Sequence, residues 1–178
     1  MDEAILADAC LMHYTFKILT DKIDIAARAA CNQNYQDSQN YKSIHKDLAL
    51  IVPATFNGAF GCELYMKAIL SDTLPNTPHE HKLNKLFELM NPNVQKFVTS
   101  IMIDIGKSRD EIYDEAKFKD ELCEYGSAFI EWRYFFEYGP KININFIKDL
   151  LAVLKATTEL LSECIDLSSV DVGELSLY

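Results

Sequence analysis

Residues 53–70 read PATFNGAFGCELYMKAIL, and this stretch decides the fold. Its apolar residues recur at helical spacing, at Phe56, Ala59, Phe60, Met66 and Leu70. One broad face of a helix is therefore predicted to point into a core. Glu63 lies on that face, and Lys67 follows four residues later, the spacing at which two side chains meet on a helix. Because buried charges are costly unless paired, further polar groups are expected to converge here.

The start of the chain predicts a longer helix. Its apolar residues repeat at spacings of four and three, at Ile5, Ala9, Met12, Phe16, Leu19, Ile23, Ala26 and Ala30. This rhythm is typical of a helix that packs lengthwise against a partner. Residues 32–42 are polar and predict a loop, after which Ser43 caps a short helix through Leu50. Pro53 then kinks that helix or occupies the first turn of the next.

Capping signals predict the helices in the middle of the chain. Thr77, Pro78 and Glu80 form a capping box with proline at the first helical position, so a helix is expected to begin near Pro78. Asn91 then caps a further helix that ends at Gly106. The inward residues expected on these two helices are Leu83, Leu86, Phe87, Met90, Val94, Phe97, Val98, Ile101 and Ile105.

Two more helices are predicted for the remainder. Ser108 and Glu111 form a second capping box, and an aromatic helix is expected from there to Gly139. The last helix should run from about Asn143 to Ile165. The inward residues expected on this pair are Phe118, Leu122, Tyr125, Phe129, Trp132, Phe136, Ile147, Leu150, Leu154, Leu161 and Ile165.

These patterns together predict an all-α protein. No segment shows sustained alternation of period two, which strands would require, so we expect an all-helical bundle of about five to six helices. Residues 1–167 should form this single domain. Residues 168–178 are acidic and are predicted to be a disordered tail.

Composition excludes several classes of protein. The 178 residues carry a net charge of −10, which argues against a generic, charge-driven coat on DNA or RNA. No apolar run approaches the roughly 20 residues that span a bilayer. The first residues are acidic where a signal peptide would be basic, so the chain is expected in the cytoplasm, without a membrane.

The five cysteines are predicted to be buried free thiols. They are odd in number, scattered, and form no CxxC pair, which argues against a disulfide framework and a zinc site. His79, Glu80 and His81 are adjacent, but three neighbours in a helical turn point in different directions. No metal and no cofactor is therefore expected.

Three strings stand in a fixed order: CELYMKAIL at 62–70, HKLNKLFELM at 81–90 and FIEWRYFFE at 129–137. With Pro53 before the first, they resemble the HEPN superfamily of helical domains, in particular small bacterial proteins of the ELYLK, HxLxxLF and RYxxE type. The resemblance covers roughly residues 45–140. It implies an up-and-down helical bundle that often dimerises. Many members act as RNases or nucleotide-linked modules in toxin–antitoxin and phage-defence systems.

One feature of the catalytic members is missing. Catalytic HEPN ribonucleases carry an arginine followed four to six residues later by a histidine. Here the next histidine after Arg28 is His45, and no histidine follows Arg109 or Arg133. The usual cleavage residues therefore cannot be transferred to this chain.

The candidate site is instead a cluster drawn from several helices. Glu63, Lys67, His81 and Arg133 are predicted to lie together, with Glu137 one helical turn after Arg133. His81, expected in the first turn of its helix, would be kept neutral by the helix dipole and could act as a base. Arg133 offers a planar fork suited to a carboxylate or a phosphate. The same cluster could equally be a structural ion-pair network.

Two functions remain open from the sequence. The first is a noncatalytic HEPN-like module that binds a partner protein or a nucleotide or RNA ligand in a bacterial defence or stress system. The second is a divergent metal-independent RNase with a site built from Glu63, His81 and Arg133. A homodimer is also expected, because the long first helix and the aromatic segment offer more apolar surface than a small bundle buries.

Overall fold

The computed structural model describes residues 1–32, 49–109, 112–125, 143–171 and 177, with side chains placed from 1–28 and then from 49 on. These residues form an all-helical bundle and contain no strand, as predicted. The elements are α1 (Glu3–Asn32), α3 (Ile51–Leu70), α4 (Leu83–Leu89), α5 (Pro92–Lys107), α6 (Glu115–Tyr125), α9 (Ile144–Ser162) and the 3₁₀ turn η2 (Leu167–Ser169).

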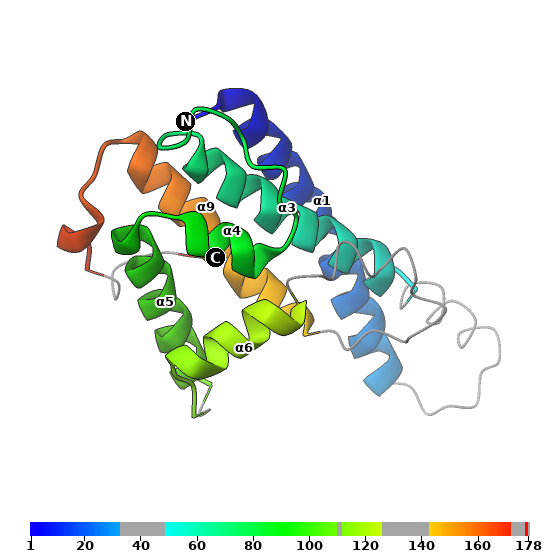
Figure 1. Cartoon of the computed structure of the whole chain (residues 1–178). Coiled ribbons are helices and arrows are strands. Elements are labelled where there is room, and N and C mark those ends of the chain that lie inside the picture. Colours follow the sequence, from blue (N-terminus) through cyan, green and yellow to red (C-terminus); the bar gives the residue numbers. More distant parts are fainter. Residues whose placement is uncertain (33–48, 110–111, 126–142, 172–176, 178) are drawn as a thin grey trace.

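Helix α3 is the centre of the bundle (Figure 1). Helix α1 runs antiparallel to it along its whole length, and α9 packs against it from another side. Helix α4 covers the end of α3, while α5 and α6 extend the bundle from α4 and α9. Between Gly58 and Leu70, every residue of α3 is buried except Phe60 and Leu64, which are half-buried.

The inward face predicted for α3 was too narrow. Phe56 and Phe60 are only half-buried, whereas Cys62 and Tyr65, which the predicted face omitted, are fully buried. The reason is that α3 has neighbours on several sides, so its buried surface is not one stripe. Pro53 lies in the first turn of α3, one of the two alternatives that its position allowed.

The seam predicted for α1 is confirmed over the described side chains. Its buried members are Ala9, Phe16, Ile23 and Ala26, and its half-buried members are Ile5, Met12 and Leu19. The side chain of Ala30 lies outside the described residues. The loop at 32–42 and the short helix from Ser43 also fall there, apart from Asn32, which ends α1, and Ala49 and Leu50, which form a turn.

Two predicted helix starts are wrong. Helix α4 begins at Leu83 and not near Pro78, because the Glu80 carboxylate bonds the next two backbone N–H groups in a non-helical turn. Ser108 ends α5 and does not cap a new helix. Helix α6 begins at Glu115, where the carboxylate of Asp114 accepts from the backbone N–H of Lys117.

Other boundaries agree with the sequence. Asn91 caps α5 and Asn143 caps α9 through their side-chain oxygens.

The end of the chain differs from the prediction. Helix α9 ends at Ser162, so Ile165, its predicted last residue, lies beyond it. The aromatic segment 126–142 is outside the described residues. In the predicted disordered tail, Ser168 and Ser169 belong to η2, and Val170 and Leu177 pack against the core.

An ion pair joins the end of α5 to α9. Arg109, just after α5, donates from Nη2 to Oδ1 of Asp149 on α9 at 2.7 Å, and its Nη1 lies 2.6 Å from Oδ2. This fork-to-fork geometry is the strong form of such a pair. Asp149 is only 2% exposed. Arg109 therefore has a structural partner in a buried carboxylate.

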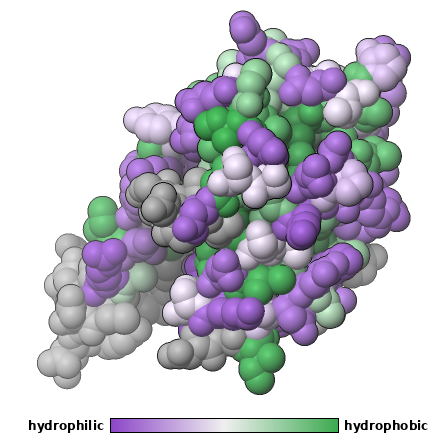
Figure 2. Space-filling model, turned by 90° about the vertical axis from the view of Figure 1, so that its left-hand side faces the viewer, coloured by the Kyte–Doolittle hydropathy of each residue, from purple (hydrophilic) through white to green (hydrophobic). Residues whose placement is uncertain are grey.

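One face of the bundle is largely hydrophilic. Figure 2 shows the side that lies on the left in Figure 1: hydrophilic residues occupy most of the outermost positions, and apolar residues show between them. Within the described ranges, none of the helices combines the length and the apolar character that crossing a membrane requires.

Gly58 permits the close approach of three helices. A Cβ placed there would lie 2.5 Å from Cγ2 of Ile147 on α9 and 2.7 Å from Cδ2 of Phe16 on α1. Both neighbours are themselves 2% exposed, so neither has room to move aside. Gly61 is less tight, since its nearest atom would be Cδ2 of Leu151 at 3.0 Å.

We expect Gly58→Ala to destabilise the protein by about 1–3 kcal/mol, because overpacking outweighs the helix propensity that alanine adds. Urea denaturation followed by circular dichroism measures the change. Gly61→Ala is the matched control and should cost clearly less. Equal stability of Gly58→Ala and the parent protein would show that the helices can separate at this point.

Candidate functional site

The centre of the predicted site is a buried ion pair on α3. Lys67 donates from Nζ to Oε1 of Glu63 at 2.8 Å. The two side chains are 10% and 2% exposed, and they lie one helical turn apart, which is why they meet. Such a pair loses its hydration on burial, so its stability depends on good geometry and on additional hydrogen bonds.

His81 supplies one additional bond. Its Nδ1 lies 2.9 Å from the same Oε1 of Glu63, and because an ionised carboxylate can only accept, this nitrogen carries the hydrogen. The imidazole is 52% exposed, whereas the carboxylate that it meets is buried. His81 is therefore the part of this cluster that reaches the surface.

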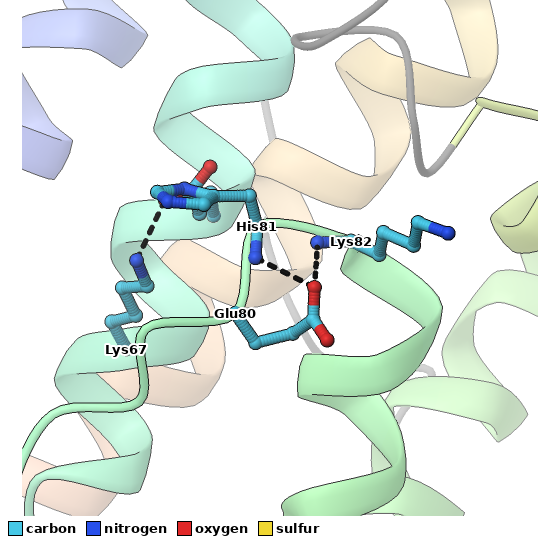
Figure 3. Close-up of polar contacts among 5 residues, drawn as sticks. Lys67, Glu80, His81 and Lys82 are labelled. Atoms are coloured by element: carbon cyan, nitrogen blue, oxygen red, sulfur yellow. Dashed lines mark hydrogen bonds and ion pairs between the residues drawn. The ribbon is translucent and has the colours of Figure 1, made fainter.

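A turn holds His81 in place (Figure 3). The carboxylate of Glu80 accepts from the backbone N–H groups of His81 and Lys82 at 2.8 and 2.9 Å, and Lys67 extends from α3 toward the same loop. These backbone bonds, led by the one from Lys82, lower the pKa of Glu80 below its usual value. Glu80 is therefore ionised at neutral pH and keeps the loop in this conformation.

One oxygen of the cluster is unsatisfied. Oε2 of Glu63 is buried and has no hydrogen-bond partner among the described residues. A buried acceptor without a donor costs about 1–3 kcal/mol. Native structures contain few such atoms, and one beside an exposed imidazole is typical of a functional site or of a site that awaits a donor.

The structure thus brings together three of the predicted residues. Lys67 and His81 both bond to the same carboxylate oxygen, Oε1 of Glu63. Arg133 and Glu137 lie outside the described residues, so their place in the cluster stays a prediction. The expected position of His81 in a first helical turn is wrong, because α4 starts two residues later. Its orientation comes from Glu63 and not from a helix dipole.

A second polar group lies on another side of α3, and the sequence analysis missed it. The hydroxyl of Tyr65 donates to Sγ of Cys10 at 3.6 Å and lies 3.4 Å from Nδ1 of His13. Cys10 and His13 are one turn apart on α1. The signal was present, since both polar residues flank the buried seam of α1, but only the antiparallel pairing with α3 connects them to Tyr65.

Burial governs the titration of this group. It lowers the pKa of His13, and the ammonium groups of Lys155 and Lys17 lower it further, against a smaller effect of Glu159. Burial also raises the pKa of Tyr65 well above its usual value. At neutral pH the imidazole and the phenol are therefore both uncharged.

The cysteines differ from the prediction in burial. Cys10, Cys62, Cys123 and Cys164 are free, as expected, but only Cys62 is buried and the other three are exposed. Cys31 lies outside the described side chains. Scattered cysteines on amphipathic helices can face either way, and spacing alone does not decide which.

Comparison of the chain with protein-family models, with curated proteins and with solved structures finds no match. The geometry of the site therefore carries the functional argument.

Replacing Lys67 alone should destabilise the fold strongly. We expect Lys67→Met to cost about 3–5 kcal/mol, because it leaves the buried Glu63 carboxylate without its cation. The double variant Glu63→Leu/Lys67→Met should recover most of that loss, since a buried pair can often be replaced by apolar residues at little cost. Chemical denaturation of the parent, both single variants and the double variant measures the coupling. Additive effects in this cycle would contradict a buried pair.

Proposed function

We propose that the chain is a noncatalytic HEPN-like helical module that binds a ligand beside His81, in a bacterial defence or stress system of the toxin–antitoxin kind. The ligand class is a nucleotide or RNA, with a partner protein as the alternative occupant. The observation that carries the proposal is the half-exposed imidazole of His81, held at the surface by a buried carboxylate.

The electrostatics of the cluster favour binding over cleavage. RNA cleavage without a metal needs groups that move protons and a cation that stabilises the charged phosphate. Lys67 is buried and bonded to Glu63, and Arg109 is bonded to Asp149, so neither cation is placed for a phosphate. The absence of an arginine followed closely by a histidine supports the same conclusion.

One observation favours the second candidate, the divergent RNase. A carboxylate that accepts from Nδ1 of an imidazole fixes the tautomer and orientation of the ring, as the acidic residue does for a catalytic histidine. With Arg133 as the cation, Glu63 and His81 would then act together on the RNA backbone. This alternative depends on the position of Arg133.

A binding and turnover assay separates the two candidates. We expect the parent protein to bind a labelled single-stranded RNA or labelled adenosine monophosphate without cleaving the RNA, and His81→Ala to weaken binding about tenfold, as loss of one hydrogen bond to the ligand does. Fluorescence anisotropy measures binding, and gel electrophoresis measures turnover.

His79→Ala, an exposed histidine two residues away, is the control and should bind normally. Cleavage by the parent that His81→Ala abolishes would establish the RNase instead. Binding that His81→Ala leaves unchanged would remove His81 from the site.

We also propose that the chain forms a homodimer through the outer face of α1. The seam first considered for this role is buried against α3, and the aromatic segment lies outside the described residues. Helix α1 nevertheless exposes a second apolar stripe: Leu11 is 56% exposed, Tyr14 64%, Ile18 40% and Ile25 67%. Their spacings of three, four and seven place them on one face, the arrangement that pairs two helices.

Light scattering tests the dimer. The parent protein should give a mass near twice the 20.3 kDa of one chain, and Leu11→Glu/Ile18→Glu should reduce it to that of one chain. Ile112→Glu is the matched control, because Ile112 is 99% exposed and belongs to the segment between α5 and α6, not to α1. A parent mass of one chain at high micromolar concentration would contradict the proposal.

A further inference from the structure

A groove of about 510 Å³ lies between α1 and α9, with α3 at its floor. Its volume falls within the roughly 300–1,000 Å³ that small-molecule sites occupy. The buried side chains of Phe16, Tyr65 and Ala152 form apolar parts of its lining, and Leu177 lies at its edge. Ala152 contributes to the space, since a larger residue at this position of α9 would fill it.

The polar groups in the groove are unevenly distributed along it. On α1, Cys10, His13 and Lys17 come first, and Asp21 and Asp24 follow one to two turns later. Along α1, the acidic groups therefore occupy one end of the groove and His13 and Lys17 the other, while α9 contributes Lys148 and Lys155.

Lysines from two helices meet at the His13 end. Lys17 on α1 and Lys155 on α9 line the groove together with His13. The positive charge of both lysines also lowers the pKa of His13. Lys155 also pairs with Glu159 at 2.5 Å, which offsets part of its charge, whereas Lys17 forms no ion pair among the described residues. In a chain of net charge −10, such a convergence of cations requires an explanation.

We propose that this groove binds a small organic anion, with a phosphate or carboxylate group between Lys17 and Lys155 beside His13, and an apolar body against Phe16 and Ala152. The site is distinct from the Glu63 cluster, because Glu63 and Tyr65 are two residues apart on α3 and face different neighbours. The anion neutralises the positive charge of the two lysines, and the apolar body excludes water from the groove.

The uncharged His13 fits this role. A neutral imidazole can donate one hydrogen bond to the anionic group from its protonated ring nitrogen, without the cost of burying another charge. The bond between Tyr65 and Cys10 keeps the floor of the groove closed below the ligand. Cys10 is exposed and lines the groove, so its thiol reports directly on whether the groove is occupied.

Alkylation of the exposed cysteines tests the proposal on the full chain. Iodoacetamide labelling is resolved by mass spectrometry, with adenosine monophosphate, decanoate or inorganic phosphate present. At least one of the two organic anions should slow labelling of Cys10 about tenfold, and Cys123 and Cys164, which lie outside the groove, should react at unchanged rates. Protection by adenosine monophosphate identifies a phosphate on an aromatic body, and protection by decanoate a carboxylate on an alkyl chain.

The variant Lys17→Gln/Lys155→Gln should bind the protecting anion about tenfold or more weakly, the loss of affinity expected when charge-assisted hydrogen bonds are removed. Lys119→Gln is the matched control, because Lys119 pairs with Glu115 at 2.5 Å on a helical surface as Lys155 pairs with Glu159. Circular dichroism verifies that the variants fold.

Failure of both organic anions to protect Cys10, or equal protection of Cys10 in the double variant and in the parent protein, would overturn the proposal. If neither organic anion protects Cys10 but adenosine monophosphate still binds, the groove proposal is overturned while a ligand beside His81 is still supported.

Discussion

The burial of α3 on nearly all sides is the constraint on which the rest of the structure depends. A helix in that position must find a partner for every polar side chain that it carries, because no water reaches them. Glu63 and Lys67 partner each other and His81, and Tyr65 partners residues of α1. These two polar groups on α3 therefore arise from one cause, and each opens to the surface on a different side.

Apolar periodicity was sufficient to predict the class of the fold. The repeats in α1 and α5 lie on helices with one buried face, and for such helices spacing in the sequence translates directly into burial. It was insufficient for α3, where half-buried Phe56 and fully buried Tyr65 have the same apolar character but different neighbours. Which neighbour a residue meets depends on how helices cross, and no local pattern contains that information.

The candidate site divides in the same way. The cost of burying Glu63 and Lys67 predicted their pairing, because the two residues are one helical turn apart and an unpaired buried charge is very unfavourable. The same cost predicted that His81 would join them. The start of α4 was misplaced since a carboxylate at Glu80 stabilises a turn as readily as a helical cap. The bonds of Tyr65 with Cys10 and His13 could not be foreseen, because more than fifty residues separate the partners.

The shared oxygen of Glu63 also bears on how this sequence can evolve. A chain that loses Lys67 first, or Glu63 first, passes through a state with an isolated buried charge, in a protein whose total stability is only about 5–15 kcal/mol. Selection removes most such intermediates, so the two positions are expected to be inherited as a unit. Among descendants of this chain, both residues should persist long after the surface around them has diverged.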